Sequence, residues 1–328
     1  MLKNKKSIAA FSALQILIFH LWVYISRSEI EMFLRLTAYI GVDIFFFISA
    51  YSLSSRNVDN YKSFIINRFN VIYSKFIIFA IIASWYKHWN ILRTIKVICG
   101  VEMLEKGGGA YLWFIPAIMI FYISYPLLQH CDKKNRTATI IISCIVWIII
   151  ASILTKYKEL NHLAIVWNRI PIFYLGYYTN KIASKHNIVN NSKFKLVVGA
   201  LLLVIGTVLL YNFGFKIKCN TPFINMYYIL GIPSSTGLIF MLSNIKEIKP
   251  IKIIGEATLE LYMVQMTFGY DIVNKVFKVT KNAIETNIIS ICAIIYISIT
   301  IHYLFKTMEG KGKKTCCMKQ LHQTSKKQ

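Results

Sequence analysis

The sequence is poor in charge, and above all in negative charge. Charged residues make up 16% of its 328 residues, with only 14 Asp and Glu against 38 Lys and Arg. Hydrophobic residues account for 56% of the chain, and the mean hydropathy is +0.51. A soluble domain of this length carries more charge at its surface, so the composition excludes an ordinary soluble protein.

Two further classes of protein are excluded by patterns that the chain lacks. The seven cysteines show no metal-ligand spacing, and the adjacent Cys316 and Cys317 match neither a zinc site nor a redox motif, so we expect no metal. The net charge of +24 does not form one basic soluble face, because Lys and Arg lie in short segments between apolar blocks. We therefore expect no nucleic acid as a partner.

What the chain does have is a series of apolar segments of about 20 residues, the length of helix that crosses a hydrocarbon core of ~30 Å. The predicted spans are residues 7–26, 36–54, 68–86, 110–130, 137–155, 164–180, 194–212, 224–242, 253–273 and 287–306. This pattern predicts an all-α fold, a polytopic helical bundle with about ten transmembrane helices in the lipid bilayer. Residues 1–306 form the membrane domain, and residues 307–328 form a basic tail that is disordered or lies on anionic lipid.

The distribution of Lys and Arg predicts the orientation of the bundle. Ten spans place both termini on one side, and Lys and Arg are more numerous in the segments on that side than in the loops on the other. The positive-inside rule therefore places both termini in the cytoplasm. The loop between the third and fourth spans runs against this rule, because it carries Lys87, Arg93, Lys96 and Lys106.

Ionisable residues inside the spans are the functional candidates, because a charge in hydrocarbon costs several kcal/mol unless it meets a partner or a wet cavity. His20 and Asp43 lie at nearly the same depth on two sequential antiparallel spans, roughly 10 Å below the outer surface at 1.5 Å per residue. They are predicted to pair. Such a pair either acts as a general base, with the carboxylate orienting the imidazole, or only locks two helices together.

Five other candidates each have two interpretations. Arg169 binds an anionic group or extends to the headgroups, and Arg68 grips a phosphate or only marks a cytoplasmic helix end. Glu260 and Gln265, on the ninth span, contact substrate or join helices by hydrogen bonds. Trp113 is an anchor at the membrane interface or a surface on which a sugar stacks.

Several segments, read in order, carry a family resemblance. They are ALQILIFHLWV with His20, GVDIFFFISAYSLSSR, FIINRFNVIYSKF, YLWFIPAIMIFYISYPLL, RIPIFYLGYYTNK and IIGEATLELYMVQ. The last resembles a Gly-x-x-Ser-x-x-x-Tyr-x-x-His motif. Together they resemble the acyltransferase type 3 family of integral membrane O-acyltransferases, over most of the chain.

The chain departs from the family pattern at several positions. Family members usually carry an Arg and an acid before the histidine, where this chain has Ala9 and Lys6. The second Arg of the basic motif is Val71, the glycine after the serine is Ala50, and the late histidine is Gln265. These departures leave open a non-catalytic family member that binds donor or glycan.

The resemblance implies transfer of an acyl group, most often acetyl from acetyl-CoA, across a bacterial cytoplasmic membrane to a hydroxyl of an extracytoplasmic polysaccharide or glycolipid. It implies that His20 is the base, that Asp43 orients it, and that Arg68 and Lys75 hold acyl-CoA. The substrate-binding candidates are Arg169, Trp113, Glu260 and Gln265. The other class to consider is a transporter of a glycan precursor or small solute, although the sequence shows no internal repeat.

Overall fold

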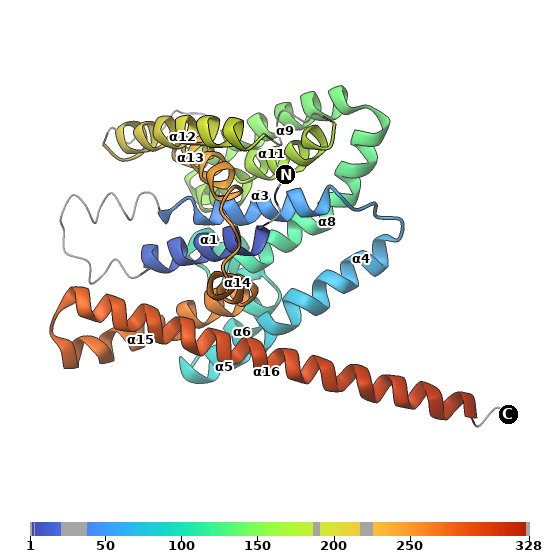
Figure 1. Ribbon diagram of the computed structural model, residues 1–328, viewed down its shortest axis with the longest axis vertical. Helices are drawn as coiled ribbons and strands as arrows, with labels where there is room; N and C mark the ends of the chain where they lie inside the picture. The colour runs from blue at the N-terminus through green and yellow to red at the C-terminus, as the bar shows by residue number, and fades with distance from the viewer. Residues whose placement is uncertain (1, 3, 21–37, 186–190, 217–225, 326–328) are drawn as a thin grey trace.

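The computed structural model describes residues 2, 4–20, 38–185, 191–216 and 226–325. Over these residues the chain forms helices and no β-strand, which confirms the all-α prediction (Figure 1). The helices are α1 (Lys5–His20), α3 (Gly41–Leu53), α4 (Tyr61–Arg68), α5 (Ser74–Tyr86), α6 (Ile91–Ile98), α7 (Val101–Lys106), α8 (Phe114–Lys134), α9 (Arg136–Lys156), α10 (Ala164–Trp167), α11 (Ile170–Ala183), α12 (Ser192–Leu209), α13 (Met226–Leu242), α14 (Lys249–Glu256), α15 (Thr258–Thr280) and α16 (Ala283–Ser325).

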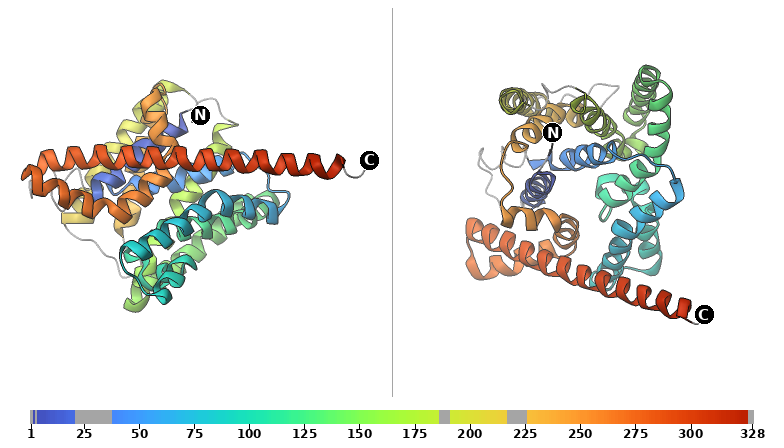
Figure 2. Two further views of the ribbon diagram at one scale, coloured as in Figure 1. Left: turned by 90° about the horizontal axis from the view of Figure 1, so that it is seen from below. Right: turned by 45° about the vertical axis from the view of Figure 1, so that its right-hand side comes forward.

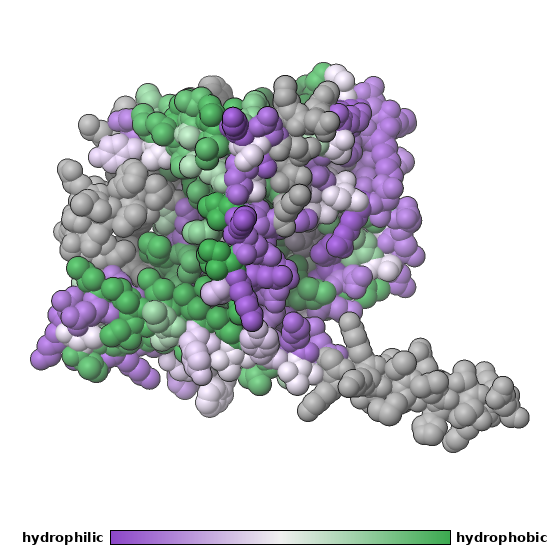
Figure 3. Space-filling view, in the orientation of Figure 1, coloured by the Kyte–Doolittle hydropathy of each residue, from purple (hydrophilic) through white to green (hydrophobic). Residues whose placement is uncertain are grey.

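Continuous helices long and apolar enough to cross a membrane coincide with five of the predicted spans. A π-helical segment, Phe69–Tyr73, joins α4 to α5, and a second one follows α12. In the described part of the chain the long apolar helices are Tyr61–Tyr86, Phe114–Lys134, Arg136–Lys156, Ser192–Phe213 and Ala283–Glu309. Apolar side chains cover much of the visible surface over α12, α13 and α15 (Figure 3). The chain is therefore membrane-embedded in character, while the count of ten spans stays a prediction.

Two predicted spans are interrupted. The segment 164–180 divides into α10 and α11 at Asn168 and Arg169, where Pro171 in the first turn of α11 starts a new helix. The segment 253–273 divides into α14 and α15 at Ala257. Both breaks bring the start of a helix into the interior of the protein, next to residues that were predicted as functional candidates.

The core is built around α3, which packs between α1 and α11 in the middle of the molecule (Figures 1 and 2). Glycines allow this close approach. A Cβ added to Gly41 would lie 2.7 Å from the carbonyl oxygen of Ser12, and one added to Gly176 would lie 2.3 Å from that of Phe47. Small residues at helix contacts bring backbones together, and this is how membrane helices commonly pack.

The segments predicted to face the cytoplasm meet at one end of the bundle. Side chains and backbone groups from the N-terminus, the α3–α4 connection, the ends of α8 and α11, and the start of α12 hydrogen-bond to one another. The contacts include Leu2 to Tyr51, Gln129 to Arg56, Asn180 to Ser54 and Asn244 to Ser192. These segments therefore share one end of the bundle, and the alternation of ends and the side that faces the cytoplasm stay predictions.

The loop between the third and fourth predicted spans is folded into α6 and α7. Three of its four cations are paired with carboxylates, and the fourth, Lys87, donates to the backbone carbonyl of Met266. Glu102 is 2% exposed and accepts hydrogen bonds from Arg93 at 3.1 Å and from Lys106 at 2.8 Å. Lys96 binds Glu105 at 2.6 Å. Cations paired with carboxylates weigh less in the positive-inside rule than unpaired ones, so this loop is a weaker exception to the rule than its count of Lys and Arg suggests.

The last helix is longer than predicted. α16 continues through Ser325, past residue 306 where the sequence predicts the last span to end, and it extends well beyond the rest of the bundle (Figure 2). The residues predicted as a disordered basic tail are therefore helical up to that point. The division into a membrane domain and a tail stays a prediction.

Candidate active site

A cavity of about 210 Å³ lies between α1, α3, α8 and α15. It brings together three of the predicted site residues from distant parts of the sequence, His20, Trp113 and Gln265. Most of the remaining wall is apolar or aromatic. It also includes Ala13, Ile16, Val42, Phe45, Ser49, Ile72, Phe114, Ile115, Ile118, Tyr122, Thr258, Leu259 and Tyr262.

The hydrogen bonding of His20 fixes which of its ring nitrogens is free. His20 is at the C-terminal end of α1, and its Nδ1 lies 2.8 Å from the carbonyl oxygen of Ile16, one turn earlier. A carbonyl oxygen can only accept a hydrogen bond, so Nδ1 carries the proton. In the neutral ring, Nε2 then keeps its lone pair and can accept a proton from a bound hydroxyl.

The predicted pair of His20 and Asp43 is wrong. Asp43 is fully buried on α3, and its Oδ1 accepts a hydrogen bond from Nη1 of Arg169, which is also fully buried. The guanidinium is always charged, so it compensates a buried carboxylate better than an imidazole does. Neither Asp43 nor Arg169 lines the cavity. The group that orients His20 is the backbone of Ile16.

Gln265 is a buried polar side chain of the wall that has no partner among the described residues. It is 5% exposed, and neither its amide oxygen nor its amide nitrogen is hydrogen-bonded within the described part of the chain. Leaving a buried polar group unpaired costs about 1–3 kcal/mol, so such a group in a cavity wall marks a position for a ligand. This favours the substrate-contact interpretation of Gln265 over the helix-joining one.

Three aromatic residues of the cavity wall also carry polar groups. Trp113 is only 8% exposed and lies in the cavity wall, a position that does not fit the interpretation of an interfacial anchor. The Tyr262 hydroxyl accepts a hydrogen bond from the backbone N–H of Phe114 at 3.5 Å. Tyr122 donates to Ser49 at 3.3 Å and ties α8 to α3.

Residues that were not singled out as candidates also line the cavity. Thr258 and Tyr262 occupy the Ser and Tyr positions of the motif in the segment IIGEATLELYMVQ. Thr258 precedes Tyr262 by four residues, and Tyr262 precedes Gln265 by three. One face of α15 therefore presents Thr258, Tyr262 and Gln265 together, since residues three and four apart share a helix face. This helical spacing was the feature of the sequence from which Thr258 and Tyr262 could have been predicted to share a site with Gln265.

Arg68 lies beside the cavity, at the end of α4. Its guanidinium stacks over the rings of Phe64 and Tyr122, 5.4 Å and 5.3 Å from their centroids, and Tyr122 is part of the cavity wall. No carboxylate among the described residues pairs with Arg68. Its N–H donors are thus free for an anion such as a phosphate.

Lys75 and Glu260 lie outside the cavity wall, where they bind each other. Lys75 Nζ lies 2.9 Å from Oε1 of Glu260, which is 1% exposed, and Nδ1 of His302 lies 3.4 Å from the other oxygen. This cluster joins α5, α15 and α16. The helix-joining interpretation of Glu260 fits this arrangement, and His302, which the sequence analysis did not single out, completes it.

The comparisons with known proteins identify the family. A model of an acyltransferase domain matches residues 9–306, nearly the whole chain. No curated protein and no solved structure matches the chain. The matched region contains every residue of the cavity described above. The chain therefore belongs to the acyltransferase type 3 family and is a membrane protein of acyltransferase type.

Proposed function

We propose that the protein is a membrane O-acyltransferase. It transfers an acetyl or larger acyl group from cytoplasmic acyl-CoA to a hydroxyl of an extracytoplasmic polysaccharide or glycolipid, in a bacterial cytoplasmic membrane. The observation that carries the proposal is the free Nε2 of His20 in a cavity shared with Gln265 and the aromatic wall. A base, an unpaired amide and aromatic faces in one cavity are what a hydroxyl acceptor requires.

The reaction needs one proton transfer from acceptor to leaving group. Nε2 of His20 removes the proton from the acceptor hydroxyl as its oxygen attacks the carbonyl carbon of the thioester. The carbon–sulfur bond breaks, and the CoA thiolate leaves and receives the proton from the imidazolium. The products are the O-acyl ester and free CoA, so atoms and charge balance without another reactant. The Ile16 carbonyl holds the Nδ1 proton throughout and stabilises the imidazolium that forms.

The donor is assigned to the side of Arg68. Acyl-CoA is confined to the cytoplasm and carries phosphates, and Arg68 offers unpaired donors beside the cavity. The cavity, about 210 Å³, is smaller than a typical site for a drug-sized ligand, so only the thioester end of the donor enters it. Lys75 is less suited to binding the phosphates of acyl-CoA than predicted, because Glu260 already neutralises its charge.

Two further cations, Lys5 and Arg56, lie at the end of the bundle that holds the N-terminus. Lys5 donates to the Ser52 hydroxyl at 3.3 Å, and its pKa is lowered, first by burial and then by the positive charge of Arg56. Cations that repel one another in this way are stabilised by a bound anion. Lys5 and Arg56 are therefore proposed to assist Arg68 with the phosphates of the donor.

The acceptor side is assigned to Gln265, Trp113 and Tyr262. A sugar presents hydroxyls around its edge and apolar C–H groups on its faces. The Gln265 amide both donates and accepts, and Trp113 and Tyr262 offer aromatic faces. Glu260 and Arg169 are removed from this role, since each is buried in an ion pair outside the cavity.

Mass spectrometry of the surface polysaccharide tests the proposal. A strain that lacks the gene is complemented with the wild-type chain, with His20→Asn, or with His130→Asn, which changes an exposed histidine of α8 outside the cavity. We expect O-acyl groups with the wild type and with His130→Asn, and none with His20→Asn at equal protein level. O-acylation that is the same with and without the gene would overturn the acyltransferase assignment. Binding of acyl-CoA without transfer would instead identify a non-catalytic family member.

A further inference from the structure

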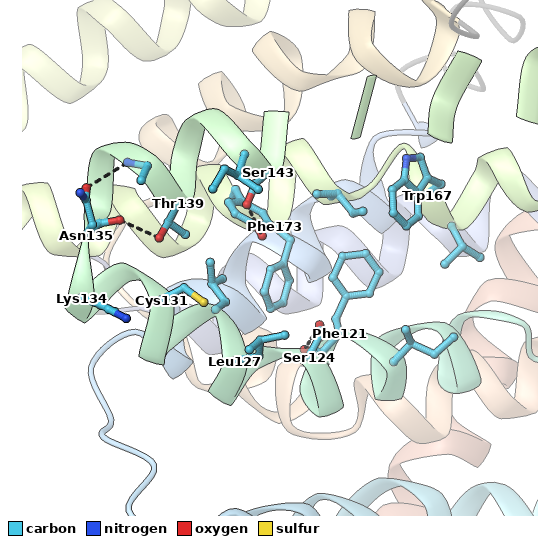
Figure 4. Close-up of a pocket in the computed structure, with 17 residues that line it drawn as sticks. Phe121, Ser124, Leu127, Cys131, Lys134, Asn135, Thr139, Ser143, Trp167 and Phe173 are labelled. Carbon is cyan, nitrogen blue, oxygen red and sulfur yellow. Dashed lines mark hydrogen bonds between the residues drawn. The ribbon is translucent and has the colours of Figure 1, made fainter. Parts of the chain in front are cut away.

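A second and larger cavity lies on the other side of α8, between α8, α9 and α11 (Figure 4). Its volume is about 580 Å³. Ring contacts of Phe46 with Phe114 at 5.2 Å and with Phe121 at 4.8 Å stand between the two cavities. Phe114 lines the first cavity and Phe121 the second, so the second one is a separate site that the proposed reaction does not use.

The wall of this groove is apolar along most of its length. Phe121 and Phe173 face each other in the middle with centroids 4.9 Å apart, and Trp167 lies at the far end (Figure 4). The polar groups in the wall already have partners: Ser143 bonds to Tyr174 at 3.0 Å, and the Trp167 indole donates to a backbone carbonyl. Apart from the weakly polar Cys131 thiol, the described residues along the middle of the groove leave no polar side chain unpaired for a sugar or a hydrated solute.

The groove opens sideways toward the hydrocarbon. Leu127 on α8 and Ile142 on α9, both in the wall, are 67% and 60% exposed, and both helices are long enough to span a membrane. The wall follows α8 from Ile120 to Lys134, a length of about 21 Å at 1.5 Å per residue. One leaflet of the hydrocarbon core is about 15 Å deep, so the groove accommodates an extended acyl chain.

The other end of the groove carries an unpaired positive charge. Lys134 and Asn135, at the turn between α8 and α9, line this end together (Figure 4). The nearby cations Arg136 and Lys181 both bind Asp132. Lys134 has no carboxylate partner among the residues that the structure describes, so its charge is available at the headgroup level.

We infer that the groove between α8, α9 and α11 binds one anionic phospholipid, with an acyl chain along Phe121 and Phe173 and the phosphate at Lys134. An anionic lipid is the one occupant that matches both ends, since a neutral lipid leaves Lys134 without a partner and a free phosphate leaves the apolar wall empty. The inference stands apart from the proposed acyl transfer, because it depends on neither His20 nor Gln265.

Native mass spectrometry of the full-length protein tests this inference. Purified protein is incubated with phosphatidylglycerol or with phosphatidylcholine, and the fraction carrying one bound lipid is measured. We expect phosphatidylglycerol to be retained in preference to phosphatidylcholine. Lys134→Gln should reduce that preference about fivefold, the factor that corresponds to about 1 kcal/mol for one lysine near an anionic surface. Lys133→Gln removes the same charge at the same turn but outside the groove, and should not reduce it.

A second pair of variants tests the apolar wall. Ala138→Trp fills the groove and should abolish retention of both lipids, whereas Ile140→Trp places the same side chain on α9 outside the groove and should leave retention unchanged. Equal loss from Lys134→Gln and Lys133→Gln, or equal retention by Ala138→Trp and Ile140→Trp, would overturn the inference. Inorganic phosphate that displaces phosphatidylglycerol completely would also overturn it, because the acyl chain would then contribute nothing.

Discussion

Asp43 and Arg169 are 126 residues apart in the sequence and form an ion pair in which each side chain is 1% exposed. The pair joins α3 to the start of α11 in the centre of the bundle. The structure thus gives Asp43 a structural partner where the sequence predicted a catalytic one. The carboxylate oxygen Oδ2 of Asp43 has no hydrogen-bond partner among the described atoms, so removing the guanidinium would leave the charge uncompensated.

Breaking this pair should destabilise the protein strongly. Removing one partner of a buried ion pair typically costs about 3–5 kcal/mol, because the other charge stays buried. We expect Arg169→Met to lower the thermal midpoint of the purified protein by more than the double variant Asp43→Leu with Arg169→Met does. A single variant as stable as the double one would show that the pair does not stabilise the fold.

The two cations predicted to hold acyl-CoA should behave differently. Arg68 has unpaired donors beside the cavity, so Arg68→Gln should raise the KM for acyl-CoA about tenfold or more, as expected for the loss of a charge-assisted contact. Lys75 is bound to Glu260, so Lys75→Gln should lower the thermal midpoint and change KM little. Steady-state kinetics and thermal unfolding of both variants check this. A raised KM for Lys75→Gln with little change for Arg68→Gln would instead show that Lys75 binds the donor.

The contact between α11 and α3 depends on Gly176. An added methyl group would lie 2.3 Å from the backbone oxygen of Phe47, which cannot move without displacing α3. We expect Gly176→Ala to cost about 1–3 kcal/mol of unfolding free energy, the usual range for overpacking. Gly109→Ala is the matched control, because its methyl group would lie 3.9 Å from the nearest atom. Equal thermal midpoints for the two variants would show that the helices separate easily.

Asp132 should make stability depend on acid pH. Burial alone would raise its pKa, but the hydrogen bond and charge of Lys181 and the hydrogen bond from Tyr177 outweigh burial and hold the pKa below its ordinary value. A lowered folded-state pKa gives stability that is complete above the unfolded pKa and is lost as the pH falls through the folded pKa. Asp132→Asn should therefore flatten the acid side of the curve of thermal midpoint against pH. The exposed Glu159→Gln should leave that curve as it is in the wild type.

The fold was largely predictable because hydropathy and charge act on whole segments. Most described residues of the ten predicted spans are helical, apart from turns such as residues 110–113, and segments rich in Lys and Arg meet at one end. The breaks at Asn168 and Ala257 were not predicted, since a break within an apolar run leaves the mean hydropathy unchanged. The charged loop of α6 and α7 was misleading for a similar reason, because counting Lys and Arg ignores the partners Glu102 and Glu105.

The candidate site was predictable only in part. His20 and Gln265 were singled out because polar residues in hydrocarbon are costly, and they do share a cavity. The predicted partner of Asp43 was wrong. Equal depth on neighbouring helices does not decide whether the carboxylate pairs with the imidazole of His20 or with the guanidinium of Arg169. Arg169 lies at the break between α10 and α11, which the sequence analysis did not place. Backbone partners such as the Ile16 carbonyl leave no trace in the sequence pattern.

The central claim is that Nε2 of His20 is the base, and turnover by the purified protein tests it most directly. Release of CoA from acyl-CoA in the presence of a glycan acceptor is measured for the wild type, His20→Asn and His130→Asn, with thermal midpoints recorded alongside. The Asn side chain keeps a hydrogen-bond donor but has no basic nitrogen, so kcat should fall about 10²–10⁴-fold while the midpoint and the His130→Asn rate stay at wild-type values. A His20→Asn protein that turns over at the wild-type rate would contradict the account.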